Sequence, residues 1–125
     1  MTLKISTKLS EATTSYLVLD GKLDAITAPE LEEFVDRNLD PAIATLILDL
    51  QALSFVSSAG LRIFAKLRKM MKSRDGKAFF VNLSPQVKKV FDIVKAVPIA
   101  EVFQDIEELD AYLANMQRKD TEEQD

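Results

Sequence analysis

The chain has 125 residues, enough for one domain with its own hydrophobic core. Sixteen Lys and Arg against twenty Asp and Glu give a net charge of −4, which argues against nucleic-acid binding because phosphate contacts need a concentrated positive surface. The absence of Cys and His excludes disulfides, thiol nucleophiles and a Ser-His-Asp triad, so we expect a non-enzymatic protein with no metal and no cofactor.

Targeting and membrane signals are also missing from the sequence. The first eight residues lack the apolar run of a signal peptide, and the longest apolar stretch is far too short to span a bilayer. We therefore expect a cytoplasmic protein without direct membrane insertion, monomeric when free.

Two strands joined by a polar turn are predicted at the start of the chain. Residues 3–9 alternate apolar and polar side chains, as a half-buried strand does, and residues 15–19 are rich in strand-forming residues. Asp20 and Gly21 form a turn signal that is expected to end the second strand. The two segments predict a β-hairpin.

A helix and a buried strand are expected next. Thr27 stands before a proline and an acidic residue at the spacing of a helix N-terminus, so Thr27 is predicted to cap a helix that stops at Asp40 and Pro41. Residues 46–50 are almost continuously apolar, which indicates a central strand covered on both faces.

Helices and strands alternate in the second half of the chain. In order, the sequence predicts a long helix ending near residue 73, a buried strand over 78–83, a helix opened by Ser84 and Pro85, a connector or very short strand over 97–99, and a helix over 106–116. The charged residues 117–125 are expected to fray as a tail.

This order of elements predicts an α/β fold within a single domain over residues 3–116. We expect a mixed sheet with an N-terminal hairpin, four to five strands and about four helices packed on it. The later strands should be parallel and joined by right-handed crossovers.

Residues 55–61 are the most informative segment for function, because they join the carboxyl end of a strand to a helix N-terminus. Ligands and partners meet α/β sheets at this edge, and the helix N–H groups would tolerate a negative group on Ser57 or Ser58. The alternative interpretation is purely structural: Ser57 is the N-cap, Ser58 fills the first turn, and Gly60 lets the helix pack closely on the sheet.

Two stretches carry a family resemblance. The segment SFVSSAGLRIF (residues 54–64) resembles the signature of the anti-sigma-factor antagonist family, whose domain is called STAS, and GKLDAITAPEL (residues 21–31) resembles a second characteristic stretch of that family. The order of elements matches as well. The resemblance implies a STAS-like fold over nearly the whole chain.

The resemblance also implies a switch. Family members are phosphorylated on the serine that matches Ser58 by a protein kinase that is also an anti-sigma factor, and a PP2C-type phosphatase reverses the modification. The unphosphorylated antagonist binds the kinase and thereby releases its client. Asp24 matches the acidic residue that lies near the phosphoacceptor in the family.

Two positions depart from the family pattern. Ser57 stands where well-known members carry Asp, which leaves Ser57 as an alternative acceptor and removes a negative charge. Ala59 stands where a Ser or Thr is frequent, which removes another possible acceptor and favours Ser58.

The helix after Ser58 is strongly basic, with seven Lys and Arg against one Asp over residues 62–77. It is interpreted either as a docking surface for an acidic partner or as an ordinary solvated face. Arg62, Lys66 and Lys69 are spaced so that they share one face of this helix. The expected partner-binding residues are Asp24, Ser57, Ala59, Gly60, Arg62, Lys66 and Lys69.

The sequence allows one alternative function and argues against another. STAS-like domains also serve as constitutive subunits of membrane transport complexes, including lipid transporters, and in that role the serines would be helix caps. A serine hydrolase or a nucleotide-binding enzyme would need a Gly-x-Ser-x-Gly elbow with a His base or a Gly-rich phosphate loop, and the chain has neither.

Overall fold

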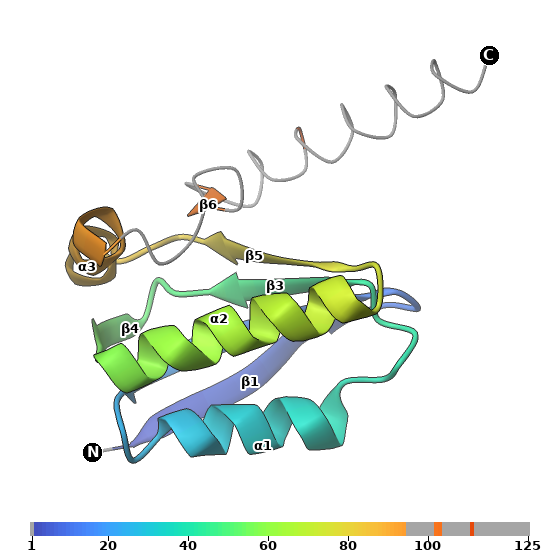
Figure 1. The fold of residues 1–125 in the computed structure, drawn as a ribbon, viewed down its shortest axis with the longest axis horizontal. Helices are drawn as coiled ribbons and strands as arrows, with labels where there is room; N and C mark the ends of the chain where they lie inside the picture. The colour runs from blue at the N-terminus through green and yellow to red at the C-terminus, as the bar shows by residue number, and fades with distance from the viewer. Residues whose placement is uncertain (1, 95–101, 104–110, 112–125) are drawn as a thin grey trace.

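A six-stranded sheet with helices on one face is the framework of the computed structural model (Figure 1). The structure describes residues 2–94, 102, 103 and 111. Its elements, in chain order, are β1 (Leu3–Ser10), β2 (Thr14–Leu23), α1 (Ala28–Asn38), β3 (Thr45–Asp49), β4 (Leu53–Val56), α2 (Ser58–Ser73), β5 (Lys77–Val81), α3 (Pro85–Val94) and β6 (Val102–Phe103). None of the helices described here has both the length and the apolar character needed to cross a membrane.

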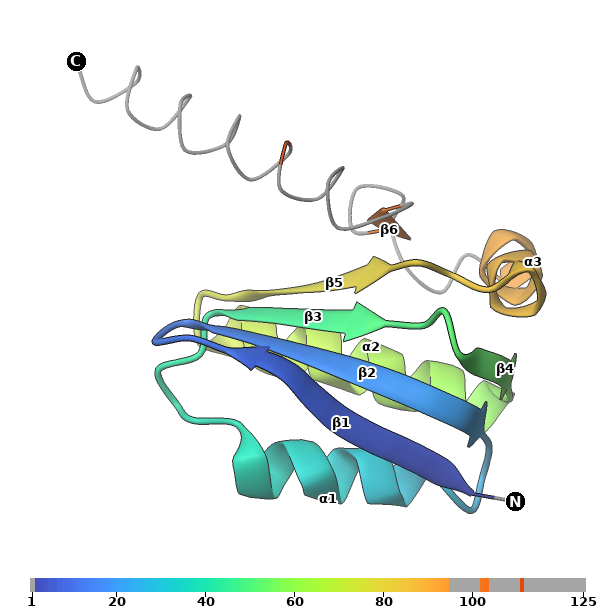
Figure 2. The same cartoon turned by 180° about the vertical axis from the view of Figure 1, so that it is seen from behind.

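The sheet is mixed, as the sequence predicts. β1 and β2 form the antiparallel hairpin, and every other pairing is parallel, in the order β1-β2-β3-β5-β6. β2 is long enough to hold two partners on one side, because residues 14–18 pair with β3 and residues 21–23 pair with β4. β4 therefore continues the line of β3 along β2, which brings the chain to the same sheet edge where β2 ends (Figure 2).

The predicted end of the second strand at Asp20 and Gly21 is wrong. β2 runs on to Leu23, and Gly21 has a φ of 123°, with a register shift to Lys22. A Cβ atom at Gly21 would lie 2.3 Å from the carbonyl oxygen of Thr2, so only glycine fits there. This glycine allows a bulge inside a strand and does not end it.

Six strands are present where four to five were expected. β4 and β6 account for the difference, because they have only four and two residues and show no clear periodicity. The predicted connector over 97–99, the body of the predicted helix over 106–116 and the tail over 117–125 lie outside the described residues. Three of the predicted helices are described, and α/β packing with a mixed sheet is confirmed.

The main core lies between the sheet and helices α1 and α2, which cover one face of it (Figure 1). Phe64 of α2, Phe80 of β5 and Phe91 of α3 pack edge to face there, with ring centroids 5.1 to 5.9 Å apart. Phe79 points to the opposite face of the sheet and is buried with Tyr16, as the alternation of a strand requires. These contacts fix the position of α2 on the sheet.

Candidate functional site

The carboxyl ends of β2 and β4 form the edge at which the predicted site residues meet. Leu23 is the register partner of Val56, and the backbone N–H of Ser57 donates to the carbonyl of Leu23 at 2.9 Å. Asp24 follows Leu23, and Ser57 follows Val56, so parallel pairing places the two motifs side by side. The structure thus brings together the two stretches that the sequence singled out.

Ser57 and Ser58 differ in what their hydroxyl groups do. Ser57 is the N-cap of α2, and its hydroxyl oxygen accepts the backbone N–H of Gly60 at 3.3 Å. Ser58 is the first residue of the helix, is exposed, and makes no side-chain hydrogen bond within the part of the chain that the structure describes. One serine is therefore occupied in the fold, and the other is accessible.

Gly60 allows the first turn of α2 to rest directly on the sheet. A Cβ atom at this position would lie 2.8 Å from Cγ2 of Val56 and 2.9 Å from Cγ of Leu23, both of which are buried. Such distances are shorter than side chains tolerate in a packed core. Gly60 consequently sets how close the Ser57–Ser58 turn sits to the ends of β2 and β4.

Asp24 holds the turn that leads from β2 into α1. Its Oδ1 accepts the backbone N–H groups of Ile26 at 2.9 Å and Thr27 at 3.0 Å. The Thr27 hydroxyl accepts the N–H of Asp24 and donates to the carbonyl of Lys22 at 2.7 Å. Thr27 does precede the helix, but its side chain caps no helix N–H, so the predicted capping by Thr27 is wrong in mechanism.

The same hydrogen bonds lower the pKa of Asp24, first through the backbone N–H of Thr27. A carboxylate whose pKa is lower in the folded state than in the unfolded state stabilises the fold at pH values above its unfolded pKa of about 4. This stabilisation is lost as the pH falls through the lowered pKa of the folded state. We therefore expect Asp24→Asn to lower the melting temperature near pH 7, with the difference from wild type shrinking as the pH falls below about 4.

Thermal unfolding measured across this pH range tests the expectation. Asp20→Asn, which removes the same charge at an exposed position of β2, is the matched control. A gap between wild type and Asp24→Asn that stays constant at every pH would contradict the role of the ionised carboxylate.

The basic residues of α2 do not form one uniform surface. Lys66 forms an ion pair with Glu32 of α1, which raises the pKa of Lys66 and ties the two helices together. Arg74 donates to backbone carbonyl oxygens beyond α1. Arg62 and Lys69 are exposed, and Arg62 lies one turn after Ser58. The charge run is thus partly structural, whereas Arg62 and Lys69 are exposed and form no such contact with the described residues.

Two exposed apolar residues at this edge were not selected from the sequence. Ile26 is 73% exposed and Phe55 is 46% exposed, and both lie within the two motif stretches. Ile26 could have been identified from the sequence as a large apolar residue in a turn, between the polar residues Asp24 and Thr27.

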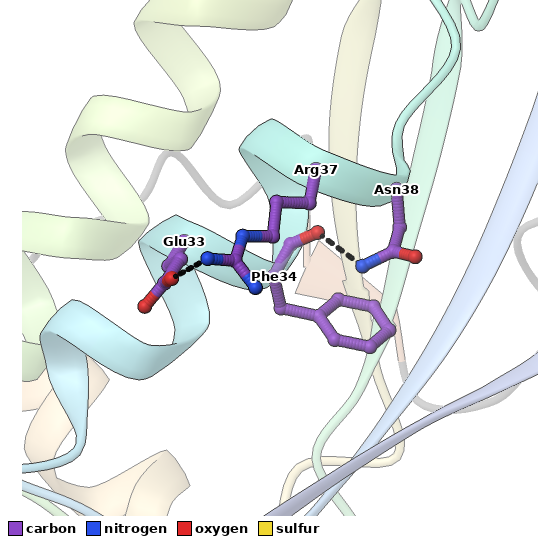
Figure 3. Close-up of polar contacts among 4 residues, drawn as sticks. All are labelled: Glu33, Phe34, Arg37 and Asn38. Atoms are coloured by element: carbon purple, nitrogen blue, oxygen red, sulfur yellow. Dashed lines mark hydrogen bonds and ion pairs between the residues drawn. The ribbon is translucent and has the colours of Figure 1, made fainter.

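A groove between α1 and β1 lies apart from these residues. It is lined by Leu3, Ile5, Glu30, Glu33, Phe34, Arg37 and Asn38. Figure 3 shows the contacts on its helical side, where Arg37 pairs with Glu33 at 2.6 Å and the Asn38 amide donates to the carbonyl of Phe34 at 2.9 Å. None of the predicted site residues lines this groove.

Comparison with known sequences identifies relatives of this chain. A family model described as STAS domain matches residues 5–109. The anti-sigma-B factor antagonist of Listeria monocytogenes is 26% identical over 102 residues, which cover 80% of this chain and 90% of that protein. BtrV of Bordetella bronchiseptica, a candidate anti-sigma factor antagonist, is 32% identical over 75 residues, which cover 60% of this chain and 65% of BtrV.

Solved structures share the fold. The unphosphorylated anti-sigma factor antagonist SpoIIAA superimposes with a TM-score of 0.74 and 21% identity over 90% of this chain and 97% of that chain. Part of the murine anion transporter Slc26a9 also matches, with a TM-score of 0.65 and 23% identity over 83% of this chain and 18% of that chain. With its family model spanning residues 5–109 and a mixed sheet that matches solved members, this chain belongs to the STAS-domain family.

Proposed function

We propose that this protein is an anti-sigma factor antagonist that binds a serine kinase acting as the anti-sigma factor, and that phosphorylation of Ser58 blocks this binding. The names of its relatives support the class of protein. The observation that carries the proposal is the contrast between the two serines: Ser58 presents an exposed hydroxyl at a helix N-terminus, whereas the Ser57 hydroxyl caps the helix. Ser58 is the phosphoacceptor, and Ser57 is its structural neighbour.

The site suits a phosphorylated serine without a change of fold. A phosphate adds a charge of about −1.5 to −2 at pH 7. The N-terminus of α2 supplies unpaired N–H groups and a partial positive charge that stabilise an anion there. A partner whose surface covers Ser58 would have to bury this dianion, so the modification opposes docking while the domain itself stays folded.

The surrounding residues have separate tasks in this proposal. Asp24 and Gly60 hold the two loops in place, and Arg62 and Lys69 offer charge to an acidic partner surface. The protein acts by binding and performs no chemistry itself. A PP2C-type phosphatase restores the binding-competent form by removing the phosphate from Ser58.

Site-resolved phosphorylation tests the proposal. The purified chain is incubated with ATP and a lysate of the organism that encodes it, and phosphopeptides are mapped by mass spectrometry. We expect phosphate on Ser58 in the wild type and in Ser57→Ala, and no phosphate on this segment in Ser58→Ala. Circular dichroism checks that Ser57→Ala, which loses a helix cap worth about 1 kcal/mol, stays folded. Phosphate on Ser57, or on neither serine, would overturn the proposal.

A further inference from the structure

Two large apolar side chains are exposed at the edge of the sheet that carries Ser58. Ile26 and Phe55 are the exposed large hydrophobic residues among those that the structure describes. Single exposed apolar residues are ordinary on protein surfaces, but those exposed around a site that a partner must cover add to the interface. Here both belong to the loops and strands that build the proposed phosphorylation site.

Both residues lie within three residues of the backbone hydrogen bond that joins Leu23 of β2 to Ser57. Phe55 lies in β4, three residues before Ser58, and pairs in register with Lys22 of β2. Ile26 lies in the turn that follows β2, where its N–H donates to the carboxylate of Asp24. The backbone N–H of Ser57 donates a hydrogen bond to the carbonyl of Leu23, and this bond keeps the two segments together at the ends of β2 and β4.

The Ile26 side chain contributes little to the fold that presents it. Its backbone is anchored by a hydrogen bond, yet 73% of the residue is exposed, so the turn displays the side chain without burying it. A side chain on a pre-ordered backbone binds a partner at a lower cost in conformational entropy than one on a segment that must first be ordered. This arrangement favours contact with a partner over a role in packing.

The occupant follows from the position of Ser58. A kinase must bring its active site to the Ser58 hydroxyl, and a stable protein interface covers about 800 Å² of each partner, far more than one side chain. Apolar residues near the acceptor therefore fall within the covered area, with charged residues such as Lys22 and Arg62 towards its rim. The expected partner surface has an apolar pocket beside the catalytic cleft.

We propose that Ile26 and Phe55 are the apolar anchors by which the kinase recognises this antagonist, and that they determine which kinase phosphorylates Ser58. This inference rests on the proposed function and adds the chemistry of recognition to it. Because burial of one such side chain contributes strongly to binding, loss of Ile26 should reduce the phosphorylation rate about tenfold or more.

The initial rate of Ser58 phosphorylation by source-organism lysate and ATP is compared for wild type, Ile26→Ser, Phe55→Ser and Ala25→Ser. Ala25 is an exposed neighbour in the same turn, so Ala25→Ser introduces the same residue but removes little apolar surface. We expect rates about tenfold lower for Ile26→Ser and Phe55→Ser, and an unchanged rate for Ala25→Ser. Melting temperatures show whether Phe55, which is 46% exposed, also supports the fold. Ile26 is 73% exposed, so its substitution tests recognition with little effect on folding.

The outcomes separate the two proposals. Phosphate on Ser58 at equal rates in wild type and Ile26→Ser would overturn the anchor role and leave the proposed function standing. An absence of phosphate on Ser58 in the wild type would overturn the proposed function, and the anchor role with it. A tenfold fall in Ala25→Ser as well would show that any change in the turn is harmful, and would also overturn the specific role of Ile26.

Discussion

Phosphorylation of Ser58 is expected to weaken binding of the partner kinase about a thousandfold, and Ser58→Asp should reproduce a large part of that loss. The reason is electrostatic: burying an uncompensated charge at an interface costs several kcal/mol, and about 4 kcal/mol corresponds to a thousandfold change in the dissociation constant. Ser58→Ala removes only an exposed hydroxyl that makes no side-chain hydrogen bond to the described residues, so it should bind like the unmodified wild type.

Isothermal titration with the kinase identified by Ser58 phosphorylation measures these affinities. Ser57→Asp is a matched control, because aspartate is itself a good N-cap and places the same charge one residue away, at a half-buried position that already serves the helix. We expect Ser57→Asp to bind far better than Ser58→Asp. Equal affinity for all variants would contradict the switch and favour the constitutive subunit of a transport complex.

Most of the element order could be predicted from the sequence because it rests on local patterns. The alternation of residues 3–9 and the apolar run at 46–50 are signals that tertiary structure reinforces. The Ser57 cap also follows from local chemistry. Such features depend on neighbours within a few residues, which a sequence shows directly.

The remaining features depend on contacts between distant segments. Gly21 resembles a turn glycine until the hairpin brings Thr2 against it, and β4 exists as a strand because β2 extends beyond β3 to receive it. Thr27 has the sequence of a cap, but its hydroxyl oxygen accepts the backbone N–H of Asp24 in place of a helix N–H. At these positions tertiary contacts overrode the local signals.

The electrostatic interpretation of α2 shows the same limit within the site. Arg62, Lys66 and Lys69 share a face by spacing, yet the Lys66 charge is paired with Glu32, which lies in another helix. The packing of α1 against α2 determines this pairing, and nothing within α2 indicates it. Ser57 and Ser58 likewise differ in hydrogen bonding and exposure, and the identity of two adjacent serines does not show this difference.

Gly60→Ala provides the sharpest test of how packing controls the site, because two effects predict opposite signs. Alanine is the better helix former, and in an exposed helix interior the change would stabilise the fold by about 1 kcal/mol. At Gly60, however, the added methyl group would meet Val56 and Leu23 at 2.8 and 2.9 Å in the core. Overpacking of this kind costs about 1 to 3 kcal/mol, so we expect a net loss and a melting temperature lower by several degrees.

Ala65→Gly is the control within the same helix, because Ala65 is exposed and reports helix propensity alone. The free energy of unfolding that Ala65→Gly loses equals the gain that Gly60→Ala would show without a clash. Comparing this expected gain with the change measured for Gly60→Ala gives the cost of the clash. A higher melting temperature for Gly60→Ala would mean that α2 does not rest on the sheet as closely as described. A lower melting temperature together with slower Ser58 phosphorylation would connect this packing to function, because relief of the clash moves the first turn of α2 and the acceptor hydroxyl moves with it.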